Sequence, residues 1–296
     1  MRIINTLLML LVLSIASLSI NTSAHHAGPV PAMQQGENEQ MFRDGSVDYR
    51  GVRFKYDKSL ATTVKASIIP ASPATKKDGG PPDTVYPRHT AFVLQDTYTS
   101  KPVSFIGSEI HIYPVDAYKA VFAKDPKTRQ AVATSIARLQ EILKKGSPTF
   151  TGDVPYLPLP DGYFAFRSHV AIVKFPHGSG LVFLTQGQQD EMPVNNQNLS
   201  YEFQGITDDG RFYVTAQFPV AAPILAFDRD KANYGGTVKE SSCVDCPDHQ
   251  RFMKEYHAYT ANIREKLDAL TPEKFQPSLK SFDDLIGSIE ITEVGN

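Results

Sequence analysis

Tryptophan is absent from this 296-residue chain, cysteine occurs twice, and neither sign of charge is in excess. Thirty Lys and Arg residues against 32 Asp and Glu give a formal net charge of -2 at pH 7. Nucleic-acid-binding proteins normally show a basic excess or a basic stripe, so this balance argues against that class. Two cysteines are also too few for a small disulfide-framework protein. The 41 % apolar and 21 % charged residues are typical of an ordinary soluble globular protein.

Sequence signatures of catalysis are lacking as well. The chain contains no His-Glu-x-x-His, no phosphate-binding loop and no dinucleotide fingerprint. A catalytic triad assembled from distant residues leaves no such signature. Two functions therefore stay open. One is a non-catalytic binding or envelope-associated protein without a cofactor, which recognises an extracellular or envelope ligand. The other is an extracellular hydrolase or metal-dependent enzyme whose site forms only in three dimensions.

Long apolar runs are confined to the N-terminus. Arg2 precedes the run Leu7 to Ile15, and Thr22-Ser23-Ala24 offers small residues for cleavage, which is typical of a secretory signal peptide over residues 1–24. The run is shorter than the about 20 residues that a membrane-spanning helix needs. We expect cleavage after Ala24, a secreted or periplasmic protein, and no transmembrane segment in the chain that remains.

The remaining chain predicts a flexible arm followed by one folded domain. Residues 25–48 are polar and punctuated by Gly and Pro, without a hydrophobic period, and are predicted to be a flexible N-terminal arm. Residues 49–296 are predicted to form a single α+β domain. Apolar alternation predicts strands near residues 52–56, 64–68, 91–94 and 109–115.

A middle helix is predicted after Asp125-Pro126, a capping residue followed by proline at the first helical position. Its apolar stripe is Val132, Ile136, Leu139 and Leu143, and Gly146 marks its end. A C-terminal helix pair is predicted next: a long helix beginning at Asp248, and a short one over residues 278–289.

Hairpins are predicted in the centre of the chain. Residues 163–175 and 181–186 flank a turn at residues 177–180, and residues 201–207 and 211–218 flank Asp208-Asp209-Gly210. In the second hairpin, Phe212 and its alternate residues would face a core while Tyr213, Thr215 and Gln217 would face water. Strands and helices in separate runs predict an α+β fold, with an antiparallel sheet of several hairpin-connected strands packed against the middle helix and the C-terminal helix pair.

One segment of about a quarter of the chain holds a series of short motifs. They are Pro155-Tyr156-Leu157-Pro158, Gly178-Ser179-Gly180, Phe183-Leu184-Thr185-Gln186, Pro193-Val194-Asn195-Asn196-Gln197, Tyr201-Glu202-Phe203-Gln204-Gly205 and Thr207 to Val214. With these motifs the segment resembles a family of uncharacterised exported bacterial proteins. The resemblance implies export and a sheet-centred domain, and it brings no catalytic residue.

Within that segment, Asn195, Asn196 and Gln197 form an amide-rich loop between two strands. Amides carry donors and acceptors without charge, so this loop could read sugar hydroxyls or a peptide backbone. The alternative, which is the commoner use of such residues, is that the asparagines bond their own backbone and shape the connection.

The cysteine pair offers three kinds of chemistry. In an exported protein, Cys243 and Cys246 are predicted to form a local disulfide. A redox pair at the start of the following helix is a second option. A zinc site of Cys243, Cys246, His249 and His257 is the third, although the eight-residue spacing of the two histidines is outside the usual range.

A copper site is a further option at the predicted new N-terminus. Cleavage after Ala24 would expose His25, with His26 behind it, and a free amine with imidazoles can chelate Cu(II). A mobile polar arm lacks the oriented surroundings that a working metal site needs. His89, His111, His169 and His177 stand alone in the sequence and are predicted to be structural or solvated.

Overall fold

The computed structural model describes residues 36–74, 84–96, 106–228, 232–234 and 247–292, all of which belong to one compact unit, Gln34–Asn296. The predicted signal peptide, the histidines of the copper option and both cysteines lie outside the described residues. None of the helices in the described ranges is both long and apolar enough to cross a bilayer.

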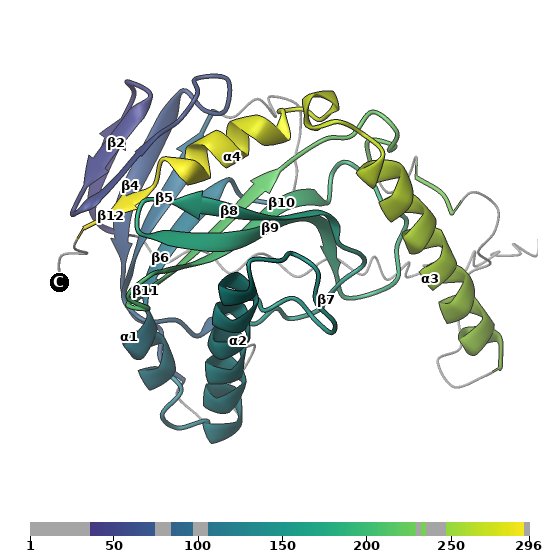
Figure 1. The fold of residues 1–296 in the computed structure, drawn as a ribbon, viewed down its shortest axis with the longest axis horizontal. Helices are drawn as coiled ribbons and strands as arrows, with labels where there is room; N and C mark the ends of the chain where they lie inside the picture. The colour runs from purple at the N-terminus through teal and green to yellow at the C-terminus, as the bar shows by residue number, and fades with distance from the viewer. Residues whose placement is uncertain (1–35, 75–83, 97–105, 229–231, 235–246, 293–296) are drawn as a thin grey trace, which may run out of the picture. The chain divides into compact units, whose positions relative to one another are not determined.

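A nine-stranded antiparallel sheet is the centre of the fold (Figure 1). Its strands follow the order β1-β4-β5-β6-β11-β10-β9-β7, and β8 also pairs with β9. The strands are β1 (Glu37–Phe42), β4 (Thr63–Ile69), β5 (His89–Gln95), β6 (Glu109–Pro114), β7 (Tyr163–Phe164), β8 (Ser168–Phe175), β9 (Gly178–Gln188), β10 (Leu199–Thr207) and β11 (Phe212–Pro219).

A second sheet and four α-helices complete the described fold. The small antiparallel sheet has the order β12-β3-β2 and joins the two ends of the folded chain. The remaining elements are β2 (Ser46–Tyr49), β3 (Val52–Lys55), β12 (Glu290–Ile291), α1 (Val115–Ala120), α2 (Pro126–Lys145), α3 (Pro247–Asp268), the 3-10 turn η2 (Pro272–Lys274) and α4 (Leu279–Gly287). This is the predicted α+β architecture, with a middle helix and a C-terminal helix pair.

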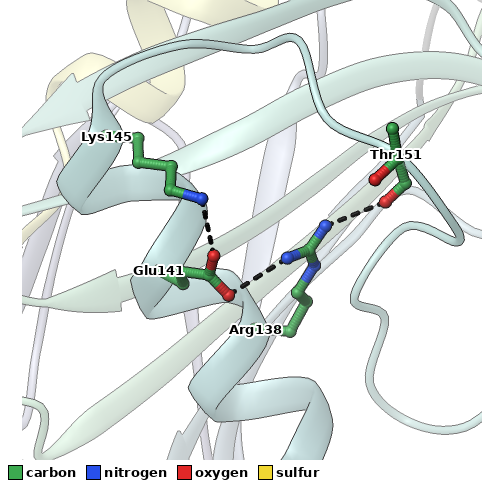
Figure 2. Close-up of polar contacts among 4 residues, drawn as sticks. All are labelled: Arg138, Glu141, Lys145 and Thr151. Atoms are coloured by element: carbon green, nitrogen blue, oxygen red, sulfur yellow. Dashed lines mark hydrogen bonds and ion pairs between the residues drawn. The ribbon is translucent and has the colours of Figure 1, made fainter.

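The predicted middle helix is confirmed as α2. The Asp125 side chain accepts a hydrogen bond from the Thr128 backbone N–H, and Gly146 ends the helix in the left-handed conformation. On the solvent side, Glu141 pairs with Arg138 and Lys145, and Arg138 also donates to the Thr151 carbonyl (Figure 2). The buried stripe ends on Ile142, while Leu143 is only partly buried.

Both faces of the large sheet are covered, which corrects one expectation. On one face, β10, β11, β4, β5 and β6 pack apolar residues against α4 and the small sheet, in a core that includes Phe203, Phe218 and Phe282. On the opposite face, α1 and α2 pack over Tyr113, Tyr213 and neighbouring apolar residues (Figure 1). The face of β11 that was expected to be wet is therefore largely buried, because an amphipathic helix covers it.

The boundary of the predicted flexible arm is wrong for residues 37–48. They form β1, which pairs with β4, and β2, which pairs with β3. All but the last residue of β1 are exposed, so the strand carries no burial pattern and is held by backbone pairing and by Glu37–Arg88 and Glu39–Lys65 ion pairs. A hydrophobic period cannot reveal an edge strand of this kind.

The first predicted hairpin is also refined. The turn is the pair of residues 176–177, His177 has a positive φ of 61°, and β9 already begins at Gly178. Glycine at 178 is required because a Cβ there would meet the Phe175 ring and lie 2.8 Å from the Ile206 carbonyl oxygen. The second hairpin is confirmed, with β10 and β11 paired from Ser200–Pro219 to Ile206–Tyr213.

Candidate functional site

A strip of polar side chains crosses three neighbouring strands on the sheet face that α1 and α2 partly cover. Register places them opposite one another, because Glu202 on β10 faces Gln217 on β11, which in turn faces Glu109 on β6. Directly opposed residues of antiparallel strands share a face. The next row holds three more polar side chains in the same register, and we call the six residues together the polar strip: Glu109, His111, Glu202, Gln204, Thr215 and Gln217.

Glu202 is a fully buried member of the polar strip, with 0 % exposure. Its Oε1 accepts from the Ser200 hydroxyl at 2.6 Å and the Gln217 amide at 2.7 Å, and its Oε2 accepts from the Tyr156 hydroxyl at 2.9 Å. Burial raises the pKa of Glu202 to about 7, against the opposing effect of these three hydrogen bonds. The group therefore changes charge near neutral pH.

Gln204 ties the polar strip to the proline-rich segment of residues 153–160. Its Oε1 accepts from the Leu157 backbone N–H at 2.9 Å and from the Tyr213 hydroxyl at 2.7 Å. Its Nε2 is buried and finds no acceptor among the described residues. Tyr156 bonds Glu202 and Leu157 bonds Gln204. The segment is therefore fixed over the inner end of the polar strip, which is the end formed by these two residues of β10.

Glu109 and His111 form its outer end. The His111 Nε2 lies 3.0 Å from Glu109 Oε2, and the His111 Nδ1 lies 3.1 Å from the Nε2 of His89 on β5. The His89 Nδ1 lies 2.8 Å from the Pro87 carbonyl oxygen. Burial, assisted by the neighbouring His111, lowers the pKa of His89 to about 3, so this ring is neutral at pH 7.

The outer end is also where the polar strip can reach solvent. The side chains of Glu109 and His111 are 24 % and 17 % exposed, and Gln217 is partly buried. Glu109 Oε1 and Gln217 Oε1 accept no hydrogen bond from the described residues. Gly107 leaves room for the carboxyl group, because a Cβ there would lie 2.5 Å from Glu109 Oε1. The polar strip thus offers unused acceptors on a rigid sheet.

The amide-rich loop, for which ligand binding and the commoner structural use were both open, uses its asparagines to build the fold. Asn195 is fully buried, and its Oδ1 accepts from the backbone N–H groups of Gln197 and Asn198 while its Nδ2 donates to the Pro193 carbonyl. The Asn196 amide bonds the Ala222 and Leu225 carbonyls and the Ala222 N–H. The alternative, structural use of these amides is what the geometry shows, so we do not place a ligand on this loop.

The metal options receive no support from the residues that are described. His249 and His257 lie on α3, where eight residues correspond to a rise of about 12 Å. Cys243 and Cys246, which the zinc, redox and disulfide options all require, and His25 and His26, which the copper option requires, lie outside the described residues. Within the described ranges, no group of three or more His, Cys, Asp or Glu residues is placed to hold a metal ion.

The histidines of the large sheet whose ring contacts are known, His89, His111 and His169, do not belong to a serine-type catalytic arrangement of described residues. Both ring nitrogens of His89 and of His111 are engaged as given above. His169, at a bulge in β8, bonds the Leu267 carbonyl through its Nε2, and the Ser168 hydroxyl donates to Asp268. These bonds fix β8 to the end of α3, so they are structural contacts.

Three of the sequence pieces behind the family resemblance meet at the polar strip. Tyr156 comes from Pro155–Pro158, Glu202 and Gln204 come from Tyr201–Gly205, and Tyr213 comes from the following turn and strand. None of the residues singled out from sequence as site candidates lies there. The available signal was the alternation of Glu202 and Gln204 inside an otherwise apolar strand, which is unusual for a buried strand.

Comparison with known proteins adds no assignment. No protein-family model matches the chain, and no curated protein or solved structure is significantly similar to it.

Proposed function

We propose that this is an exported, non-catalytic binding protein whose ligand is a small uncharged molecule rich in hydroxyl groups, bound at the outer end of the polar strip. The observation that carries the proposal is the pair of unused acceptors, Glu109 Oε1 and Gln217 Oε1, on adjoining strands. Rigid strands hold such groups in place before the ligand arrives, which reduces the cost of ordering them on binding.

The chemistry of the polar strip supports a hydroxyl-bearing ligand. Carboxylate and amide side chains bond hydroxyl groups as acceptors, and an amide also donates. Aromatic rings adjoin the polar strip: at its outer end the Tyr113 and His111 rings stack with centroids 5.8 Å apart, and beside Glu202 the Tyr156 and Phe164 centroids are 4.8 Å apart. Binding sites for small molecules typically combine a few placed polar groups with aromatic walls.

The test is an NMR titration of the full chain with three sugars that differ in charge. Glucose is neutral, glucosamine is a cation and glucuronate is an anion of the same ring size. We expect glucose at millimolar concentration to shift the side-chain signals of Gln217 and His111 in a saturable manner, and the charged analogues to do so less. Absence of a saturable shift with glucose, or a stronger response to either charged analogue, overturns the proposal.

Matched variants locate the site. Glu109→Gln removes a carboxylate from the polar strip, whereas Glu39→Gln removes one from the exposed edge strand β1, where it pairs with Lys65. We expect the first to weaken glucose binding by about tenfold, the loss of about 1.4 kcal/mol that one hydrogen bond to a charged group can supply. The second should bind as the parent does. Equal affinities in both variants would place the sugar elsewhere.

A hydrolytic enzyme is the second candidate, and the raised pKa of Glu202 is the observation that favours it. A carboxyl group that titrates near pH 7 is suited to donate or accept a proton in a reaction. The discriminating measurement is release of nitrophenol from nitrophenyl glycosides and esters. Turnover that is lost in Glu202→Gln would establish the enzyme, and turnover equal to buffer would leave the binding protein.

Export belongs to the same proposal and rests on the N-terminal sequence. The experiment is intact mass measurement of the protein recovered from its host. A mass that begins at His25 supports export with cleavage after Ala24, and a mass lower by two hydrogens supports the disulfide between Cys243 and Cys246. Recovery of the entire chain from the cytosol would contradict export.

A further inference from the structure

The three hydrogen bonds that link Glu109, His111, His89 and Pro87 determine how many hydrogens the two imidazole rings carry. The Pro87 carbonyl oxygen only accepts, so the His89 Nδ1, 2.8 Å away, must carry a hydrogen. A carboxylate oxygen also only accepts, so the His111 Nε2, 3.0 Å from Glu109, must carry one too. The 3.1 Å contact between the two rings needs a third. Two neutral imidazoles carry only two N–H hydrogens, so the three hydrogen bonds require one additional proton.

The surroundings decide where the additional proton resides. His89 is 3 % exposed, so a charge on it would be buried. The titratable side chains of β6 beside it are His111 and Tyr113, with ring centroids 5.2 Å and 4.3 Å from its own. His111 is more exposed and lies directly against the Glu109 carboxyl group. The other titratable groups beside the two rings are the hydroxyls of Tyr113, stacked on His111, and of Tyr86, edge-on to His89. Glu202 lies on the same face but bonds Ser200, Gln217 and Tyr156. Both tyrosines are neutral at pH 7, because the pKa of a tyrosine is near 10 and burial raises it further.

We propose that His111 is held as an imidazolium between the Glu109 carboxylate and a neutral His89, and that His89 is the positioning residue that fixes this state. The carbonyl of Pro87 fixes the His89 tautomer with Nδ1 protonated, which leaves Nε2 as an acceptor. His111 therefore donates from both nitrogens, to His89 on one side and to Glu109 on the other.

The charge state of His111 helps to define the ligand class, and this consequence rests on the proposed function. The positive ring compensates the Glu109 carboxylate, so the outer end of the polar strip has strong acceptors without an uncompensated charge. A neutral hydroxyl-bearing molecule suits such a site better than an ion does, because an ion would add a charge to an already balanced pair.

The experiment is measurement of the ring nitrogen signals of the ¹⁵N-labelled full chain at pH 7, assigned with a His111→Gln variant. We expect His111 to show two protonated nitrogens and His89 to show one, at Nδ1. A bare Nε2 on His111, which would mean a protonated Glu109 or a broken bond, overturns the proposal. Two protonated nitrogens on His89 overturn it equally.

Two substitutions test the positioning role. Glu109→Gln, at a partly exposed site, should convert His111 to the neutral ring with a bare Nε2, because an amide N–H can donate to it. His89→Leu removes the acceptor for Nδ1, and we expect the His111 Nδ1 signal to change to that of a bare nitrogen while Nε2 still donates to Glu109. His89→Gln retains an acceptor and a donor, so His111 should keep two protonated nitrogens.

Unaltered His111 signals in both Glu109→Gln and His89→Leu would contradict the assignment. Because these spectra involve no ligand, they can succeed while the sugar titration fails. In that case the ligand class is wrong and the protonation state stands.

Discussion

The two faces of the large sheet are buried by different kinds of side chain. The face covered by α4 is lined by apolar side chains, and at its centre the Phe218 and Phe282 rings stack at 4.9 Å with Tyr201 beside them. The face over which residues 153–160 pass carries the polar strip. The same two strands, β10 and β11, supply both, because side chains alternate between faces along a strand.

The contrast shows that stability alone does not explain the second face. A carboxyl group buried at Glu202 must be compensated by three hydrogen bonds, and well-packed apolar residues of similar volume are often at least as stabilising. The chain nevertheless places Glu202, Gln204 and Gln217 there. Under the proposed function, the apolar face serves folding and the polar strip serves ligand binding.

Phe282→Ala is expected to have the largest effect, on the apolar face. It removes a fully buried ring that packs against Tyr201 and Phe218, so the unfolding free energy should fall by about 3–5 kcal/mol. Denaturant titration measures the loss. Met41→Ala, 39 % exposed on β1, is the control and should change it little. A small loss in Phe282→Ala would show that this face is not the main source of stability.

The pH dependence of stability tests the polar face. The pKa of Glu202 is raised from 4.5 to about 7 in the folded state, so its contribution is full below pH 4.5 and is lost as pH rises through 7. The pKa of His89 is lowered from 6.5 to about 3, so its contribution is full above pH 6.5 and is lost as pH falls through 3. Between pH 4.5 and 6.5 the two slopes have opposite signs and largely cancel.

Single substitutions should separate the two slopes. In Glu202→Gln the unfolding free energy should rise with pH between 4.5 and 6.5, and in His89→Gln it should fall, each by a few kcal/mol since one pKa unit corresponds to about 1.4 kcal/mol. Denaturant midpoints across that range measure both. Identical pH profiles in the parent and in both variants would mean that neither group has a shifted pKa.

Asn195→Ala tests whether a buried polar side chain outside the polar strip contributes to stability and not to ligand binding. The variant leaves the backbone N–H groups of Gln197 and Asn198 without their acceptor in a buried loop, so we expect a loss of about 1–3 kcal/mol in unfolding free energy. Sugar binding measured in the same samples should be unchanged. Lost binding in a variant that remains folded would return the loop to the list of ligand contacts.

The smallest effect is expected on the surface of α2. Glu141→Gln weakens the pairs with Arg138 and Lys145 that Figure 2 shows, but all three side chains are in contact with water. Exposed ion pairs contribute little. The denaturation midpoint should remain within experimental error of the parent. A clear shift would mean that the Arg138 contact with the Thr151 carbonyl depends on Glu141 for its position.

Local signals were sufficient for much of the fold. The Asp125 cap, the apolar stripe of α2 and the turn at Asp208–Gly210 each specify their element within a few residues, and the structure has all three. The edge strand β1 was missed because it buries almost nothing. The outward face of β11 was misassigned because the sequence of a strand does not say that a distant helix covers its second face.

Local sequence patterns did not predict the candidate functional site. His89 and His111 are 22 residues apart, stand alone in the sequence and were predicted to be structural or solvated, and strand pairing brings the His89 Nε2 within 3.1 Å of the His111 Nδ1. The pKa of Glu202 is raised only because the assembled sheet and the chain packed over it bury the carboxyl group completely, and its partner Tyr156 lies 46 residues earlier in the sequence. Such contacts depend on strand order, which the hydrophobic pattern does not encode.

The amino-acid sequence was sufficient for the class of the fold, for α2, α3 and α4 and for the central hairpins, because periodicity, caps and turns act over a few neighbouring residues. It did not reveal α1. Tertiary structure alone decided which polar residues meet. The sheet places β6 beside β11 and β11 beside β10. This strand order brings glutamates, glutamines and histidines that are distant in the sequence into one polar strip, in which Glu109 Oε1 and Gln217 Oε1 accept no hydrogen bond from the described residues.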